Sequence, residues 1–427
     1  MFPKLFEPFW DTSLLAKAKE KSILSSDVKS FLDFCGPKKR VDAPSFGTGA
    51  GMLIKPEIVE TAIEAQEAKY GKAYKIFFSP AGKKATPTLL KSIAKKAQDS
   101  GHLLLACARY EGMDARVEEE YADEVVSIGD FVTMGGDVPA MLFLEGLLRF
   151  IPGVVGKEES VEQDSFSGAF VDYPEFTHPV EWKGAVVPEI VRSGNHGEVA
   201  KWRKGQAAKR TVFGHFDWLR SYPDLTKEDI ALAREHMPNH YVTVLHSDVL
   251  LKHGLIGNTS VTSLDIHDIA RSCATYGIKN YFLASKLEDQ KKIVRTFLDF
   301  WEKGYGAEYN VHRHEAVKSI VLLNSLNEAI AAIKEKEGKE PIVVATSAKD
   351  FGPGKSITYG DQAKVWAGDR PVLIVFGTGH GLSPETMDRC DYFLGPIVGF
   401  SDFNHLSVRS AVAVVLDRWI GINKASR

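Results

Sequence analysis

Cysteine is scarce in this 427-residue sequence, and its few copies are scattered. The four cysteines stand at positions 35, 107, 273 and 390, and no two of them form a C-x-x-C pair. That spacing argues against a disulfide framework and against a structural zinc site. The histidines at 267, 380 and 405 show no ligand spacing either. We predict a protein of the reducing cytoplasm with no metal bound by its own side chains.

Long hydrophobic runs are also missing. The longest ones, such as residues 372–376 and 412–416, are far shorter than the roughly 20 residues that a membrane-spanning helix needs. Charged residues interrupt the N-terminus, which argues against a signal peptide. The formal net charge of -3 gives no global nucleic-acid signature, so any RNA affinity must come from a local basic surface. The sequence therefore predicts no membrane partner.

Strand-like and helix-like segments alternate from residue 75 onward. Residues 75–78 are typical of a strand, 87–101 of a helix that Gly101 ends, and 102–108 of a second strand. Such alternation predicts an α/β fold with a parallel sheet covered by helices. A further helix is expected at 139–150, followed by a polar, flexible linker at 155–175.

A chain of this length favours two or three domains. A second α/β array follows residue 239. Strands are expected at residues 240–251, 280–285, 319–324, 341–348, 371–377 and 391–397. Ser383 can cap a helix that Pro384 opens. The last helix, 408–419, carries one apolar face that should pack against the sheet. We expect residues 239–427 to fold alone.

The densest cluster of polar and glycine residues lies between positions 108 and 141. ARYEGMD begins at residue 108, IGDF at residue 128 and GGDVPAM at residue 135. Gly135 and Gly136 would let main chain approach a ligand and would permit positive φ. The cluster therefore predicts a ligand pocket lined by backbone.

These motifs resemble the TrmD family, the bacterial tRNA (guanine-N1)-methyltransferases of the SPOUT class. The resemblance covers residues 5–237 and includes LRFIPGVVG, EQDSFSG and SGNHGEVAKWR. Residues 239–425 resemble a separate SPOUT RNA-methyltransferase family through VVATSAK, FGTGHGLS and NHLSVRSAVAVVLDR. The resemblance implies two SPOUT domains with trefoil knots, at 1–154 and 239–427. Between them it places the linker, 155–175, and a helical tRNA-binding domain, 176–238.

Methyl transfer to guanine N1 requires removal of the ring proton while negative charge spreads toward O6, so a base and a cation must converge. The resemblance assigns the base to Asp164, stabilisation of charge to Arg149 and shaping of the local field to Glu111. Plainer roles remain open. Asp164 would then be an acid of a solvated linker, and Arg149 would satisfy carbonyls at a helix end.

The methyl donor implied by the family is S-adenosylmethionine (SAM). In the first domain we expect it to contact Phe77, Phe78, Ser79, Pro80, Ala108, Ile128, Gly129, Asp130, Phe131, Val132, Thr133, Gly135, Gly136 and Pro139. In the second domain the corresponding residues are Thr346, Gly377, Gly379, Gly381, Ile397, Leu406 and Val408. Backbone at Gly379 should approach the ligand closely, so that Gly379→Val would block it. A core role is the alternative for the apolar residues among them.

The tRNA partner should bind along residues 195–220, where basic residues follow a helical pattern and imply one basic face. The expected RNA contacts are His196, Lys201, Arg203 and Arg210. The family further implies a homodimer in which Asp164 of one chain serves the SAM pocket of the other. Its target is the guanine 3′ of the anticodon, with Mg²⁺ as an assisting ion.

This sequence departs from the family pattern in several places. Most of an N-terminal strand that the family has before Phe2-Pro3 is absent, and Ala43 and Thr48 interrupt a motif of acids and glycines. Ala108 replaces the usual glycine and Phe131 the usual tyrosine, which predicts weaker donor binding. The alternative function is therefore a SAM-binding module for RNA docking or dimerisation, with one or both domains inactive.

Two nucleotide-binding lookalikes fit poorly. In residues 377–381 the third glycine comes one residue too early for G-x-G-x-x-G. In residues 349–356 lysine replaces the first glycine of a P-loop.

Overall fold

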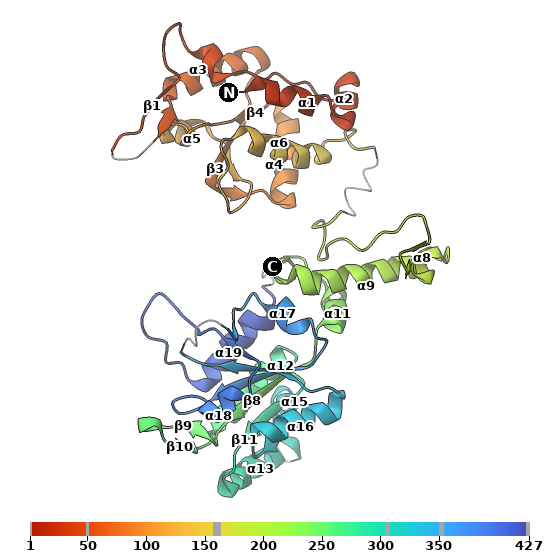
Figure 1. Cartoon of the computed structure of the whole chain (residues 1–427), viewed down its shortest axis with the longest axis vertical. Coiled ribbons are helices and arrows are strands. Elements are labelled where there is room, and N and C mark those ends of the chain that lie inside the picture. The colour runs from red at the N-terminus through yellow and green to blue at the C-terminus, as the bar shows by residue number, and fades with distance from the viewer. Residues whose placement is uncertain (1, 48–50, 157–163, 304–307, 350–353, 424–427) are drawn as a thin grey trace. The chain divides into compact units, whose positions relative to one another are not determined.

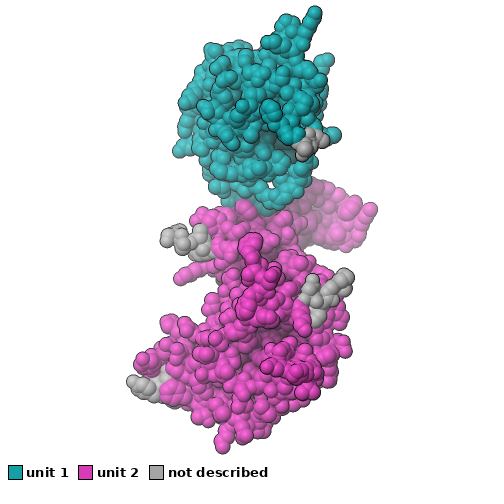
Figure 2. All heavy atoms as spheres, turned by 90° about the vertical axis from the view of Figure 1, so that its left-hand side faces the viewer, with its two compact units in different colours: residues 1–167 teal, residues 168–427 magenta. Residues whose placement is uncertain are grey.

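The computed structural model describes residues 2–47, 51–156, 164–303, 308–349 and 354–423 (Figure 1). Thr48 and part of the predicted linker lie outside these ranges. The chain divides into two compact units, residues 1–167 and 168–427, which Figure 2 colours separately. Within the described residues, no helix has the length and apolar character needed to cross a membrane.

The first unit is built on a three-stranded parallel sheet with the strand order β4-β3-β5. Its strands are β3 (Tyr74–Lys84), β4 (Leu103–Ala106) and β5 (Glu124–Ser127). Because side chains alternate along a strand, Ile76 and Phe77 are buried on opposite faces of the sheet. Both faces of this sheet are therefore covered.

Helices form a layer on each face. The face with Ile76 packs against α2 (Ser13–Glu20), α4 (Pro87–Ser100) and α6 (Asp137–Leu147), and the face with Phe77 against α3 (Pro56–Tyr70) and α5 (Ala115–Tyr121). A short antiparallel pair, β1 (Asp42–Pro44) and β2 (Met52–Ile54), carries Ala43 opposite Leu53. The short helices are η1 (Pro3–Leu5), α1 (Phe6–Trp10), η2 (Phe31–Phe34) and η3 (Leu148–Phe150).

One edge of this sheet borders a cavity. The described residues that precede β1 contain helices and turns and no strand. The edge of β4 that does not pair with β3 faces a hollow of about 820 Å³, which residues 103–107 of the chain line together with side chains of α3 and α6. Among the described residues, no further strand pairs with this edge of β4.

The second unit begins with a mainly helical segment. Its elements are β6 (Glu181–Trp182), β7 (Ala185–Val186), α8 (Glu189–Arg192), α9 (His196–Gly214), α10 (Phe216–Ser221) and α11 (Lys227–His236). The Asn195 side chain caps α9 by accepting a hydrogen bond from the Glu198 N–H. The helical pattern predicted for 195–220 is present as two helices. It breaks at His215, whose φ of -142° and ψ of 40° are not helical.

A seven-stranded parallel sheet forms the rest of this unit, in the order β12-β11-β8-β15-β13-β16-β14. The strands are β8 (His240–Leu245), β11 (Tyr281–Ala284), β12 (Ile320–Leu323), β13 (Ile342–Thr346), β14 (Ser356–Ile357), β15 (Val372–Gly377) and β16 (Tyr392–Leu394). The predicted α/β class with parallel sheets is confirmed for both units.

Helices cover both faces of the large sheet. On the face that carries Val242 lie α12 (Ser263–Thr275), α13 (Glu288–Glu302), α15 (Val311–Val317), α17 (Gln362–Trp366) and α19 (Val408–Ile420). The face that carries Tyr241 packs against α16 (Leu326–Glu337), with α18 (Pro384–Asp388) nearby. Ser383 caps α18 as predicted.

The helical segment shares a core with this sheet. Val212 and Leu219 are buried in the same apolar cluster as Val242, and the Phe216 ring meets Trp366 edge to face at 5.1 Å. Residues 168–238 and the large sheet thus form one packed body.

The predicted strand at 240–251 ends early. Asp248 has a φ of 57°, which interrupts the strand and starts a separate ribbon of β9 (Val249–Leu250) and β10 (Ile256–Gly257), joined by η4 (Lys252–Gly254). The two-residue strand β14 was not predicted, because so short an edge strand leaves no periodic pattern.

Candidate functional site

Hydrogen bonds join the loops that follow β4 and β5. Arg109 and Gly135 form an antiparallel bridge, and the Gly136 N–H donates to the Ala108 carbonyl at 2.7 Å. The Arg109 guanidinium donates to the carboxylate of Asp137, which is buried at the start of α6, at 2.7 Å. The structure thus brings the predicted motifs at 108 and 135 together at one end of the sheet.

The two glycines have a different role from the one predicted. A Cβ on Gly135 would lie 2.5 Å from Arg109 Cδ, and one on Gly136 would lie 2.9 Å from the Ala108 nitrogen. They are glycine because the two loops need this space. Positive φ occurs instead at Gly112 and Gly129, with values of 118° and 155°.

The segment from Phe77 to Pro80, predicted to contact SAM, lies inside β3, which extends beyond the strand predicted at 75–78. The register of β3 on β5 shifts between Phe78 and Lys83, so the strand continues beyond residue 78. Phe77 is buried, and Phe78 packs edge to face on Phe143 at 5.5 Å. Both side chains belong to the core, while Ser79 and Pro80 are more exposed.

The loop after β5 offers an apolar surface. Phe131, Val132 and Met134 are 58%, 82% and 92% exposed, whereas Ile128 is half-buried and Pro139 is buried. Thr133 ties the loop together by donating to the Gly135 carbonyl, and Asp130 pairs with Lys84. Apolar side chains beside accessible backbone suit the adenine and ribose of a SAM molecule. The residues present therefore fit this donor.

Two further residues, Cys107 and Glu111, lie near these loops. Burial raises the pKa of the Cys107 thiol to about 12, so it stays protonated and unreactive. Glu111 lies over Gly51, and its N–H donates to the Met52 carbonyl at 3.1 Å, which fixes the loop against β2. The predicted field-shaping residue is thus also a packing residue.

Arg149 and Asp164 form an ion pair within the first unit. Arg149 lies in η3, directly after α6, and the two side chains are 46% and 38% exposed. The predicted base and cation are therefore adjacent. Arg149 follows Asp137 by twelve residues of α6 and η3. At a rise of 1.5 Å per residue this separates the backbones of Asp137 and Arg149 by about 18 Å along the helix axis.

In the second unit, the topology gathers the predicted donor residues. β15, β13 and β16 are parallel neighbours, so Thr346, Gly377 and Ile397 follow strand ends on the same edge. Asn404 donates to the Ala348 carbonyl at 2.8 Å and joins two of these loops. Leu406 is exposed there, and Val408 begins α19. The loops that carry these predicted donor residues therefore gather at one edge of the sheet.

The glycines of this edge serve the protein's own backbone. Gly379 has a φ of 63°, and a Cβ there would lie 2.8 Å from the Leu250 carbonyl oxygen. A Cβ on Gly377 would lie 2.9 Å from the backbone of Gly381 and Leu382. Gly381 also has a positive φ, 114°. Gly379→Val would therefore distort the fold, and the substitution cannot test ligand approach as expected.

Sequence reasoning missed a hydroxyl network at the same edge. The Thr259 and Thr378 hydroxyls are 2.6 Å apart, and Thr378 donates to the Leu245 carbonyl at 2.8 Å. His246 Nδ1 lies 3.2 Å from the Thr259 hydroxyl, and burial lowers the pKa of this histidine. Residues so distant in sequence give no local signal of their contact.

The predicted single basic face on α9 is wrong. His196, Arg203 and Arg210 recur every seven residues, close to two helical turns, and share a face. Lys201 lies two residues from Arg203 and therefore points elsewhere. The Arg203 guanidinium lies 4.7 Å from the Tyr173 ring centroid, and Lys201 pairs with Glu198 at 2.9 Å. The helix has two basic sides.

Comparisons with known proteins agree with both halves of the chain. The family described as tRNA (Guanine-1)-methyltransferase TrmD matches residues 1–221, and the family described as SAM-dependent RNA methyltransferase matches residues 239–421. A tRNA (guanine-N(1)-)-methyltransferase of Nitratidesulfovibrio vulgaris is 38% identical over 99% of this chain and 98% of its own length. Proteins of the same name from Deinococcus radiodurans and Bacillus subtilis are 41% and 38% identical over 53% and 52% of this chain, which is 77% and 91% of their own lengths. The chain belongs to the TrmD family of SAM-dependent tRNA (guanine-1)-methyltransferases and carries a second RNA methyltransferase domain.

Proposed function

We propose that this enzyme is a cytoplasmic homodimer that methylates N1 of the guanine 3′ of the anticodon, with both sheets closed as SPOUT folds by trefoil knots. The family membership and the first donor site support the reaction. The four unpaired cysteines are compatible with the reducing cytoplasm. Incubation with labelled SAM and unmodified tRNA tests the proposal. It should yield 1-methylguanosine at that position.

The observation that carries this proposal is the separation along α6. The donor loops meet its first residue, Asp137, and the ion pair of Arg149 and Asp164 lies beyond its last turn. A gap of about 18 Å is far more than a bound purine can bridge. One chain therefore does not complete the site that methyl transfer to guanine requires.

A second copy can complete it. Val138 and Leu142, four residues apart, are exposed on one face of α6, and the apolar loop at 131–134 adjoins the start of this helix. If two copies pair α6 in antiparallel fashion, the Arg149 end of one helix lies near the Asp137 end of the other. Exposed apolar surface of this extent is typical of an interaction site.

Within such a composite site the roles follow from chemistry. Asp164 accepts the N1 proton, Arg149 stabilises negative charge that develops toward O6, and Glu111 holds the loop and its field in place. SAM supplies the methyl group. The apolar loop of the first domain excludes water from it. Ala108 and Phe131 differ from the family pattern. The loop that contains Ala108 still keeps its backbone contacts with residues 135 and 136.

Mg²⁺ has a limited role in this proposal. Among the residues that the structure describes, no three His, Cys, Asp or Glu side chains are grouped to hold an ion. An assisting Mg²⁺ would therefore take most of its ligands from RNA and water. The assignments to Asp164 and Arg149 do not depend on it.

We expect only one of the two basic sides of α9 to bind tRNA. We propose that His196, Arg203 and Arg210 contact the RNA backbone, so that Arg203→Gln with Arg210→Gln flattens the dependence of log Kd on log salt by about 1.4–1.8. The matched control, Lys201→Gln with Lys204→Gln, removes equal charge from residues that already pair with Glu198 and Asp229. Fluorescence titrations with tRNA at several salt concentrations measure both slopes. Equal slopes for the two variants would contradict this placement.

The second domain is proposed to bind SAM at the edge formed by Thr346, Gly377 and Ile397. Because Val212 and Leu219 are buried against its sheet, a fragment 168–427 should be more stable than a fragment 239–427. Each buried apolar side chain contributes roughly 1.5–3 kcal/mol. A loss of about 3 kcal/mol would lower Tm by about 6–12 °C. Calorimetry without and with SAM compares the two fragments, and equal Tm values would show that residues 168–238 add nothing to this core.

A second candidate function for this domain is dimerisation or RNA docking without turnover. Its loop after β16 exposes Val398, Phe400, Phe403 and Leu406. Such a surface favours a protein partner. SAM binding by the longer fragment without methylation of any RNA would support this candidate.

A further inference from the structure

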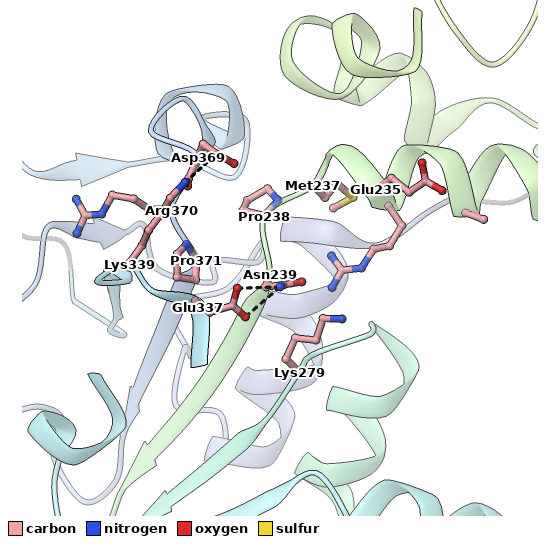
Figure 3. Close-up of a pocket in the computed structure, with 12 residues that line it drawn as sticks. Glu235, Met237, Pro238, Asn239, Lys279, Glu337, Lys339, Asp369, Arg370 and Pro371 are labelled. Atoms are coloured by element: carbon pink, nitrogen blue, oxygen red, sulfur yellow. Dashed lines mark hydrogen bonds and ion pairs between the residues drawn. The ribbon is translucent and has the colours of Figure 1, made fainter. Parts of the chain in front are cut away.

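A pocket of about 430 Å³ lies at the amino edge of the large sheet, where α11 leads into β8 (Figure 3). Side chains from α11, from the end of α16 and from the segments before β8, β11, β13 and β15 line it. The six residues of β8 separate it by about 20 Å from the carboxyl edge where SAM is proposed to bind. The pocket is therefore distinct from that donor site.

Arg234, in the last turn of α11, has an unsatisfied nitrogen at this pocket. Its Nη2 donates to the Gly277 carbonyl at 2.8 Å. Its Nη1 is buried and has no hydrogen-bond partner among the described residues. A buried donor of a charged group that lacks an acceptor destabilises the protein. An anion that reached this nitrogen would remove that destabilisation.

The lysine opposite is also available. Lys279 is exposed at the pocket, and its ammonium forms no ion pair with any described residue (Figure 3). The two cations differ from Lys339, which pairs with Asp369 at 2.7 Å, and from Arg370, which donates to the Glu340 and Pro341 carbonyls. Arg234 and Lys279 therefore each have a donor without an acceptor among the described residues.

The carboxylates of the pocket are largely occupied. Glu337 accepts from Asn239 Nδ2 at 3.0 and 3.1 Å and from the Tyr241 hydroxyl, and Asp369 is held by Lys339. Glu235 is exposed on α11, and Glu337 keeps its negative charge because its hydrogen-bond partners are neutral. The Asn239 amide that holds Glu337 is drawn in Figure 3. Four cations and three carboxylates line the pocket, so its charges leave an excess of one positive charge for an anion.

One basic residue of α9, Lys209, lies near the pocket. The hydrogen bond from Lys339 is the main cause that lowers the pKa of Asp369, and burial is the main cause for His236. The charge of Lys209 lowers both pKa values further. Asp369 lines the pocket, and His236 ends the same helix as Arg234. Lys209 is therefore a cation of α9 that lies close to this pocket.

We propose that the pocket binds a phosphate group of the RNA backbone, with Arg234 Nη1 and the Lys279 ammonium as donors. The inference rests on the proposed binding of tRNA to α9. It gives the second domain a part in holding the substrate of the first, because the pocket is built from α11 and the amino ends of the second domain's strands. A planar guanidinium with a free N–H and a mobile ammonium form a pair suited to phosphate oxygens.

The test uses the full chain with Arg234→Gln and Lys279→Gln combined. Loss of two phosphate contacts should flatten the dependence of log Kd for tRNA on log salt by about 1.4–1.8. The control, Lys252→Gln with Lys292→Gln, removes the same charge from exposed sites away from the pocket and should leave the slope unchanged. Arg234→Lys with Lys279 intact keeps the charge. It should retain most of the slope even if the guanidinium hydrogen bond to Gly277 is lost.

Two results separate the failure of this inference from the failure of the proposed function. If the unaltered chain forms no 1-methylguanosine in tRNA, the proposed function fails first. If it does, and the pocket variant keeps the unaltered slope, the pocket does not contact RNA. Binding of inorganic phosphate that the pocket variant loses, with no change in the tRNA slope, would overturn the proposal in favour of a small-anion site.

Discussion

Asp164→Ala lowers the rate of guanine-N1 methylation by about 10²–10⁴, the usual contribution of a general base. The N1 proton must leave as the methyl group arrives, and Asp164 is the carboxylate that lies beside Arg149. Without it, Arg149 keeps its charge but has no base beside it. Single-turnover measurements with saturating tRNA and SAM report this step directly.

The affinity for SAM should survive the same change, because the carboxylate takes a proton from the guanine base and makes no ground-state contact with the donor. Calorimetric titration with SAM checks this. Asp99→Ala, which removes an exposed acid from α4, is the matched control and should keep the unaltered rate. Near-normal turnover in the Asp164 variant would assign the base to another residue.

Much of the architecture was predictable from local pattern. Apolar strands that alternate with amphipathic helices gave the parallel sheets, and the Ser383 and Pro384 pair gave the start of α18. The gathering of Thr346, Gly377 and Ile397 also follows from sequence order, because parallel strands place their carboxyl ends on one edge. These features depend on periodicity and chain direction, which a sequence carries.

The predictions that were wrong concern residues whose roles are set by tertiary contacts. Gly135 and Gly136 are glycine because another loop occupies the space of their side chains, and Phe78 belongs to the core because it packs on Phe143. Neither fact has a local signature. The error on α9 is of another kind, since 3.6 residues per turn already place Lys201 and Arg203 on different sides of a helix. The helical repeat alone is enough to predict two basic sides.

The separation of Asp164 from the donor loops along α6 leads to a testable prediction about the proposed dimer. Asp164 and the donor loops lie at opposite ends of one helix, so a working site in the proposed dimer combines the donor loops of one copy with Asp164 of the other. Two differently damaged chains can then restore each other. Ala108→Phe serves as the second defect, because a large side chain at this half-buried position fills the donor loop.

Coexpression of the Asp164→Ala chain and the Ala108→Phe chain with different tags should recover about one quarter of the unaltered activity. Random pairing makes half of the dimers mixed, and each mixed dimer has one intact site of two. Each variant alone should be nearly inactive, and the Ala108→Phe chain should fold, as its melting curve will show, yet bind little SAM. Coexpression of two differently tagged Asp164→Ala chains is the control and should stay inactive. If the mixture of the two different variants also stays inactive although mixed dimers are isolated through both tags, Asp164 acts on the donor loops of its own chain. Arg149 and Asp164 would then have to approach those loops within one chain.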